Sequence, residues 1–165
     1  MLKKIIVSLL AVGVILVPNG ANASSHAKSL QNLGMNEIMF AQMMIPHHEQ
    51  AISMSETALK KSRNQEITKL SRQIKSLQSS ETSQLTYWLK ATNSSMTMDH
   101  DMKMPGMLTV KELASLKRLT GTQFDRTFLQ LMIKHHQGAI EMLDLISDSK
   151  NTEAKALAKA IKSAQ

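Results

Sequence analysis

Apolar residues recur every three or four positions along most of the chain, which is the spacing of one face of an α-helix. This spacing predicts four long helices, over about 36–61, 65–91, 123–147 and 152–165. The apolar stripe of the second helix is formed by Ile67, Leu70, Ile74, Leu77, Leu85 and Trp88. No segment shows the strict alternation that is typical of a half-buried strand. The chain is therefore expected to be all-α.

Local signals mark where some of these helices begin, bend or end. Asn64 is a suitable N-cap for the second helix, and Pro46 should kink the first because proline removes a backbone hydrogen bond. Thr109 and Glu112 have the spacing of a capping box, which predicts a short extra helix that ends at Gly121.

One segment of the chain occurs twice. The sequence Phe40-Ala-Gln-Met-Met-Ile-Pro-His-His-Glu-Gln-Ala-Ile-Ser-Met54 matches residues 128–142 at an offset of 88. Further matches follow at an offset of 87, between Glu66, Leu70, Ile74, Gln78 and Glu153, Leu157, Ile161, Gln165. Each copy is predicted to be a helical hairpin, so two copies predict a four-helix bundle with a pseudo-two-fold relation between its halves. The first repeat covers about 36–92, a linker covers 93–108, and the second repeat covers about 109–165.

Two pairs of adjacent histidines lie at matching positions of the two repeats. With residues about 100° apart around a helix, His47 and His48 flank the apolar centre of their helix by about 60° or less. His135 and His136 take the same angles in the second repeat. All four imidazoles are thus expected to face the bundle interior, where a nitrogen without a partner is costly. They are either hydrogen-bonded core histidines or metal ligands.

Methionines surround both pairs at helical spacing. Met43 and Met44 each stand four residues before a histidine, and Met54 follows His47 by seven. Imidazole with thioether sulfur suits copper, with Cu(I) favoured and Cu(II) possible, whereas zinc prefers thiolate, imidazole and carboxylate. Glu81 stands on the apolar stripe of the second helix. It is interpreted as a metal ligand, as an acceptor for an imidazole N–H, or as a carboxylate at the bundle end.

The linker is also rich in soft ligands. Residues 96–107 hold five methionines and one histidine, and Pro105-Gly106 and the lack of periodicity make the segment a loop. A low-complexity linker without metal is the alternative, but the composition favours capture of Cu(I) or Ag(I). The complete set of candidate ligands is Met43, Met44, His47, His48, Met54, Met132, His135, His136 and Met142 in the repeats, and Met96, Met98, His100, Met102, Met104 and Met107 in the linker.

The N-terminus and the composition indicate export. Lys3 and Lys4 precede an apolar run over 5–17 and a small-residue cleavage site at 21–23, which predicts a signal peptide over 1–23 and a mature domain over 24–165. The apolar run is too short to span a bilayer, so no stable membrane insertion is expected after cleavage. The chain has 13 methionines and no cysteine, and methionine is the soft sulfur ligand that escapes disulfide formation in a periplasmic or secreted protein. The basic residues, which give a net charge of +7, are scattered, so no nucleic-acid partner is expected.

The chain lacks the sequence motifs of common enzymes, including Glu-x-x-His, His-Glu-x-x-His, Gly-x-Ser-x-Gly and a phosphate-binding glycine loop. The protein is therefore expected to bind metal without catalysing a reaction. A ferritin-like metal-dependent oxidase and a structural helical module for a protein partner are the alternatives.

The doubled Met-Ile-x-His-His-x-x-Ala-Ile-x-Met motif, with Phe124-Asp125 before it and Gln78-x-x-Glu81 after it, resembles a secreted bacterial family catalogued as domain of unknown function 305. The resemblance covers about residues 35–165 and implies a ferritin-like helical bundle. With the linker added, it is similar to a periplasmic copper-binding member, which implies copper buffering and resistance, with an exporter or a metal-sensing protein as a partner. The residues that it implies as ligands are His47, His48, Met54, His135, His136 and Met142. The second repeat stops at Gln165, before a counterpart of Glu81, so either the last helix is short or the chain is truncated, and this weakens the expectation of two symmetric metal sites.

Overall fold

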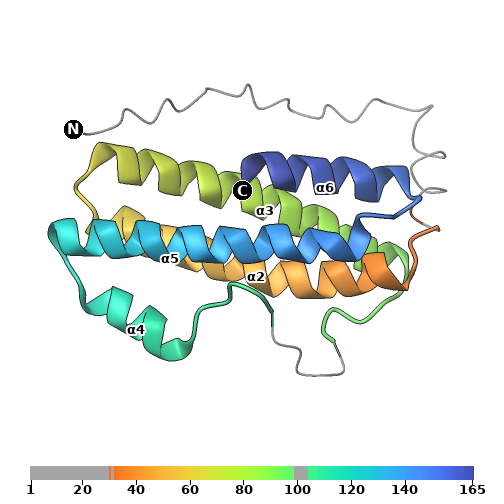
Figure 1. The fold of residues 1–165 in the computed structure, drawn as a ribbon, viewed down its shortest axis with the longest axis horizontal. Helices are drawn as coiled ribbons and strands as arrows, with labels where there is room; N and C mark the ends of the chain where they lie inside the picture. The colour runs from red at the N-terminus through yellow and green to blue at the C-terminus, as the bar shows by residue number, and fades with distance from the viewer. Residues whose placement is uncertain (1–29, 31, 99–103) are drawn as a thin grey trace.

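The structure is a computed structural model that describes residues 30, 32–98 and 104–165. Every element in these residues is helical (Figure 1): α2 (Met35–Lys61), α3 (Gln65–Ala91), α4 (Val110–Arg118), α5 (Gly121–Met142), the 3₁₀ helix η1 (Leu143–Ile146) and α6 (Thr152–Ala164). No strand occurs in the described part of the chain. The predicted all-α class is confirmed.

The four long helices form a bundle of two hairpins, α2–α3 and α5–α6. Figure 1 shows α2 and α5 side by side and running in opposite directions, while the short helix α4 lies outside the bundle, next to α5. The second helices of the hairpins meet where Gln78 Nε2 on α3 donates at 3.5 Å to Oε1 of Gln165, the C-cap residue of α6. The predicted bundle of two repeated hairpins is confirmed.

Side chains cap the starts of α3, α4 and α6, and the caps of α3 and α4 are the ones that the sequence predicted. Asn64 Oδ1 accepts hydrogen bonds from the backbone N–H groups of residues 66 and 67, at 2.9 and 3.5 Å. Its counterpart in the second repeat, Asn151, caps α6 in the same way. Thr109 Oγ1 accepts from the Glu112 N–H at 3.2 Å, and Glu112 Oε2 accepts from the Thr109 N–H at 2.7 Å. Each cap satisfies backbone donors that a helix start leaves without partners.

Two predicted helix ends are wrong. Gly121 does not end α4, whose C-cap is Leu119. Gly121 is instead the first residue of α5, with a φ of +56° that glycine adopts without steric cost. The predicted helix to residue 147 remains α-helical only to Met142, after which the last turn tightens into η1. At Pro46, α2 continues as one helix to Lys61.

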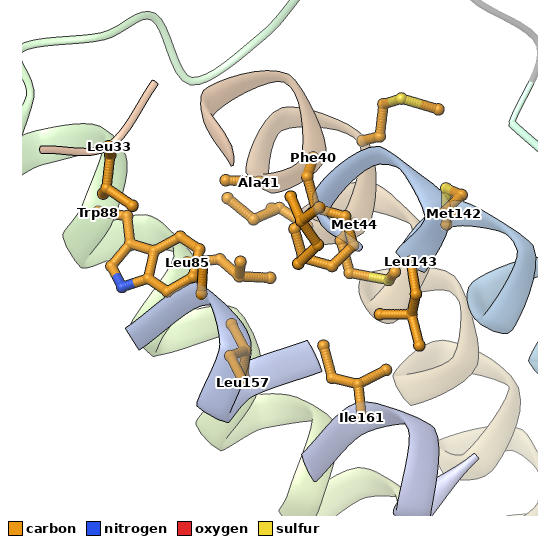
Figure 2. Close-up of a cluster of buried hydrophobic side chains, with 14 of the residues drawn as sticks. Leu33, Phe40, Ala41, Met44, Leu85, Trp88, Met142, Leu143, Leu157 and Ile161 are labelled. Carbon is orange, nitrogen blue, oxygen red and sulfur yellow. The ribbon is translucent and has the colours of Figure 1, made fainter. Parts of the chain in front are cut away.

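The core consists of two clusters of buried apolar residues. The first cluster, seen in Figure 2, includes Phe40, Met44, Leu85, Trp88, Met142, Leu157 and Ile161. The second cluster includes Ala51, Met54, Ile74, Phe124, Phe128 and Met132. Matching residues of the two repeats lie in opposite clusters: Phe40 is in the first and Phe128 in the second, whereas Met54 is in the second and Met142 in the first. The pseudo-two-fold relation between the repeats therefore exchanges the clusters.

Some predictions concern residues outside the described ranges. The predicted signal peptide at 1–23 lies there, as do two candidate linker ligands, His100 and Met102. None of the described helices combines the length and the apolar character that a bilayer crossing requires.

Candidate metal centre

The four motif histidines lie at mid-helix on α2 and α5, between the two apolar clusters. The side chains of His47, His48 and His135 are completely buried, and His136 is half-buried. The ring centroids of His47 and His135 are 3.8 Å apart, and those of His135 and His136 are 6.3 Å apart. The inward orientation expected from the helical angles is confirmed, and the two repeats bring their histidines together.

Most of the ring nitrogens in this group have no hydrogen-bond partner. The Nδ1 atoms of all four histidines are buried without one among the described residues, and so is Nε2 of His135. Nε2 of His48 is likewise buried without a hydrogen bond, whereas Nε2 of His47 donates to the Pro105 carbonyl oxygen at 3.1 Å. An unpartnered buried polar atom costs about 1–3 kcal/mol, so such atoms are rare in folded proteins and need an explanation. A bound cation that accepts their lone pairs is one such explanation.

Glu81 contacts this group from α3. Its Oε2 lies 2.8 Å from Nε2 of His48, and its side chain is nearly buried. The two atoms are close, yet their angles do not suit a hydrogen bond. At this distance the carboxylate is within reach of an imidazole N–H. Of the three interpretations from the sequence, this position favours an acceptor for an imidazole N–H, because Glu81 is not at an exposed bundle end.

Burial keeps three of these histidines neutral. Together with the charge of the neighbouring His48, which is the smaller cause, it lowers the pKa of His47 and of His136 to about 4. Burial also lowers the pKa of His135 to about 2, together with the repulsion of a positive charge by the other three imidazoles. Near pH 7 the three rings are therefore uncharged. Neutral imidazole is the form that ligates a metal ion.

The methionines lie on both sides of the histidines. Met43, Met44 and Met142 belong to the first cluster, and Met98 and Met104 of the linker pack against it. Met54 and Met132 belong to the second cluster. Met107 is half-buried, and Met96 is exposed. The structure thus brings two linker methionines to the helix methionines of one cluster, and it separates these from Met54 and Met132.

An open pocket of about 490 Å³ lies at the first cluster. It is lined by Asn36, Met43, Pro105, Glu141, Met142, Asp144 and Leu145. Two candidate thioether ligands, which are themselves buried, line the pocket beside two carboxylates. The carboxylates were not predicted from the sequence, because they flank the motif without a distinctive spacing of their own.

The described residues around the histidines do not form a preorganised chelating site. In the described ranges, no three His, Asp or Glu side chains converge in the geometry of a metal site, and the chain has no cysteine. Zinc sites are usually built from such sets. The donors that are present, neutral imidazole and thioether, fit the softer Cu(I) and Ag(I) better.

The family model of "Domain of unknown function (DUF305)" matches residues 37–165. Among solved structures, a predicted secreted DUF305 protein from Streptomyces coelicolor is 27% identical, with a TM-score of 0.70 and coverage of 78% of this chain and 84% of its own. A DUF305 fragment from Deinococcus radiodurans is 30% identical, with a TM-score of 0.72 and coverage of 78% and 86%.

A third similar structure is CopM in its Cu(I)-bound form, 30% identical over 78% of this chain and 86% of its own, with a TM-score of 0.63. CopM has also been solved in Cu(II)-bound and Ag-bound forms. No curated protein matches the chain.

Proposed function

The chain belongs to the DUF305 family, and within it we propose that the protein is a copper-binding protein that sequesters or shuttles Cu(I) and Cu(II) in copper homeostasis and resistance. Ag(I) is a further ion of the same chemical class. The proposal assigns the protein to the periplasm or the exterior of the cell. An exporter or a metal-sensing protein is the proposed recipient of the metal.

The observation that carries the proposal is the set of four imidazoles whose buried Nδ1 atoms lack partners among the described residues. A core histidine is normally retained by hydrogen bonds at both nitrogens, or its burial is costly. Two adjacent pairs in matching places, with thioethers on either side, instead suit a soft cation. The Cu- and Ag-bound forms of the similar CopM support the same ion class.

Binding is favoured over catalysis, because the described site offers no general acid or base poised against a substrate. Its titratable groups are four imidazoles, of which those of His47 and His135 are in contact, and one carboxylate that contacts His48. We therefore propose that the protein carries copper and does not use it in a reaction.

The direct experiment is a titration with Cu(I) in the presence of a competing chelator. The protein is compared with a variant in which His47, His48, His135 and His136 are all replaced by alanine, and with the control His26→Ala, which removes a histidine outside both motifs. We expect stoichiometric binding by the protein and the control, and its loss in the fourfold variant. Unchanged binding in the fourfold variant, if it keeps its helical circular dichroism, would move the site to the linker. Oxygen consumption during Cu(I) addition would support the oxidase alternative.

A further inference from the structure

Residues 105–108 of the linker, here named the linker seat, are fixed to α2 beside the histidines. Gln50 holds this segment through two backbone bonds: its Nε2 donates to the Leu108 carbonyl at 3.1 Å, and its Oε1 accepts from the Leu108 N–H at 2.8 Å. Pro105, at the other end of the linker seat, accepts the hydrogen bond from His47 Nε2. The position of this backbone therefore affects His47, one of the candidate ligands.

The linker seat also packs on the backbone of α5, and this contact requires two glycines. A β-carbon at Gly138 would overlap the backbone of Pro105 and Gly106. A β-carbon at Gly106 would lie 2.8 Å from the His135 carbonyl oxygen, and Gly106 has a φ of +73° that other residues rarely adopt. The close approach thus depends on the absence of side chains at both positions.

Gln50 and Gly138 occupy the same position of the two repeats, at the offset of 88. In the first repeat, the Gln50 side chain binds the linker backbone. In the second repeat, Gly138 has no side chain, and this leaves room for the linker backbone to pack against α5. Both residues allow the same contact, the packing of the linker seat on α2 and α5. The position of the linker seat is therefore determined by both repeats.

The contact has a chemical consequence for His47. A carbonyl oxygen can only accept, so the proton of the imidazole must be on Nε2. The other nitrogen, Nδ1, is buried without an acceptor, so a second proton there would be an unsatisfied donor. The ring is left with its lone pair on Nδ1. Histidines that ligate metals commonly donate their other N–H to a backbone carbonyl, which fixes the tautomer and orients the ring.

We propose that the linker seat, held by Gln50 and Gly138, is a positioning element that fixes His47 as the Nε2–H tautomer and so makes Nδ1 its metal-binding nitrogen. This inference rests on the proposed function. Gln50, Pro105 and Gly138 act through His47 and do not touch the metal. The linker would contribute to the structured site through a backbone carbonyl, independently of its methionines.

The test compares three variants with the unaltered protein. Gln50→Ala removes both bonds to Leu108, and Gly138→Ala forces the linker away from α5, although alanine itself favours the helix. The matched control is Gln42→Ala, which also removes a glutamine of α2 that binds the linker backbone, at Ser95 and Thr97. Long-range proton–nitrogen NMR spectra of the metal-free proteins report the tautomer of His47. Titration with Ag(I) against a competing chelator reports affinity.

In the unaltered protein and in Gln42→Ala we expect only the Nε2–H tautomer of His47. In Gln50→Ala and Gly138→Ala we expect a mixture of tautomers and an Ag(I) affinity about tenfold lower, the usual effect of losing such a partner. An unchanged tautomer in both variants would overturn the inference. A higher affinity would also overturn it, because Pro105 would then compete with the metal for Nε2. Failure of the unaltered protein to bind Ag(I) would contradict the proposed function, while the metal-free spectra would still decide whether the linker seat sets the tautomer.

Discussion

His47 and His135 occupy matching positions of the two repeats, and their imidazole rings are in contact, with centroids 3.8 Å apart and planes tilted by 35°. Gln78 and Gln165, another matching pair, are joined by a hydrogen bond at the same interface of the hairpins. Residues related by a two-fold axis approach each other only near that axis, so the axis of the duplication passes through the histidine group. A metal ion there would receive ligands from both halves of the chain.

Acidification should destabilise the metal-free protein. The unfolded pKa of a histidine is about 6.5, whereas in the fold the pKa is about 4 for His47 and His136 and about 2 for His135. Between pH 6.5 and 4 the unfolded chain thus binds protons that the fold does not. The stability present above pH 6.5 is lost as the pH falls, by about 1.4 kcal/mol per pH unit for each histidine.

Urea unfolding of the metal-free protein at several values between pH 7 and pH 4 measures this loss. In the variant His135→Gln, the free energy of unfolding should depend less steeply on pH, because the unfolded chain takes up one proton fewer. Equal free energies of unfolding at pH 7 and pH 5 would show that the imidazoles are not kept neutral by burial.

Glu81→Gln should weaken metal binding without unfolding the bundle. The carboxylate lies 2.8 Å from His48 Nε2, where it can accept the imidazole proton and make the ring a better donor. An amide accepts more weakly, so we expect an affinity for Cu(I) lower by about tenfold. The control is Glu66→Gln, at an exposed position of the same helix. If both variants bind as the unaltered protein does, Glu81 has no role in orienting His48.

Phe40→Ala and Phe128→Ala should destabilise the protein by similar amounts. The two phenylalanines are completely buried at matching positions, one in each cluster. Truncation of a buried phenylalanine costs about 3–5 kcal/mol. Ile133→Ala, at an exposed position of α5, should cost much less. Chemical unfolding measures all three, and a large cost for only one phenylalanine would mean that the two clusters do not contribute equally to one cooperative fold.

Much of the fold could be predicted from the sequence because its signals are local. Periodicity and capping residues such as Asn64 and Thr109 set where α3 and α4 begin. The end of α5 was misplaced because a 3₁₀ turn keeps nearly the same apolar spacing as an α-helix. Gly121 was misinterpreted because positive φ suits glycine at a helix end and equally at a helix start.

The sequence predicts the positions of the four histidines but not their contacts. The helical angle of the doubled histidines predicts that they face inward, because that angle depends only on position in the helix. The contact between His47 and Pro105 depends on how a loop packs across two helices, which periodicity does not encode. The separation of Met54 from its counterpart Met142 follows from the opposite directions of α2 and α5. A single helical stripe could not reveal it.

Anomalous diffraction from crystals soaked with Cu(I) tests the central claim most directly. The account predicts a copper peak within bonding distance of imidazole nitrogens from both repeats, with Nδ1 of His47 among them. Peaks only along residues 96–107, or no peak beside either histidine pair, would contradict it.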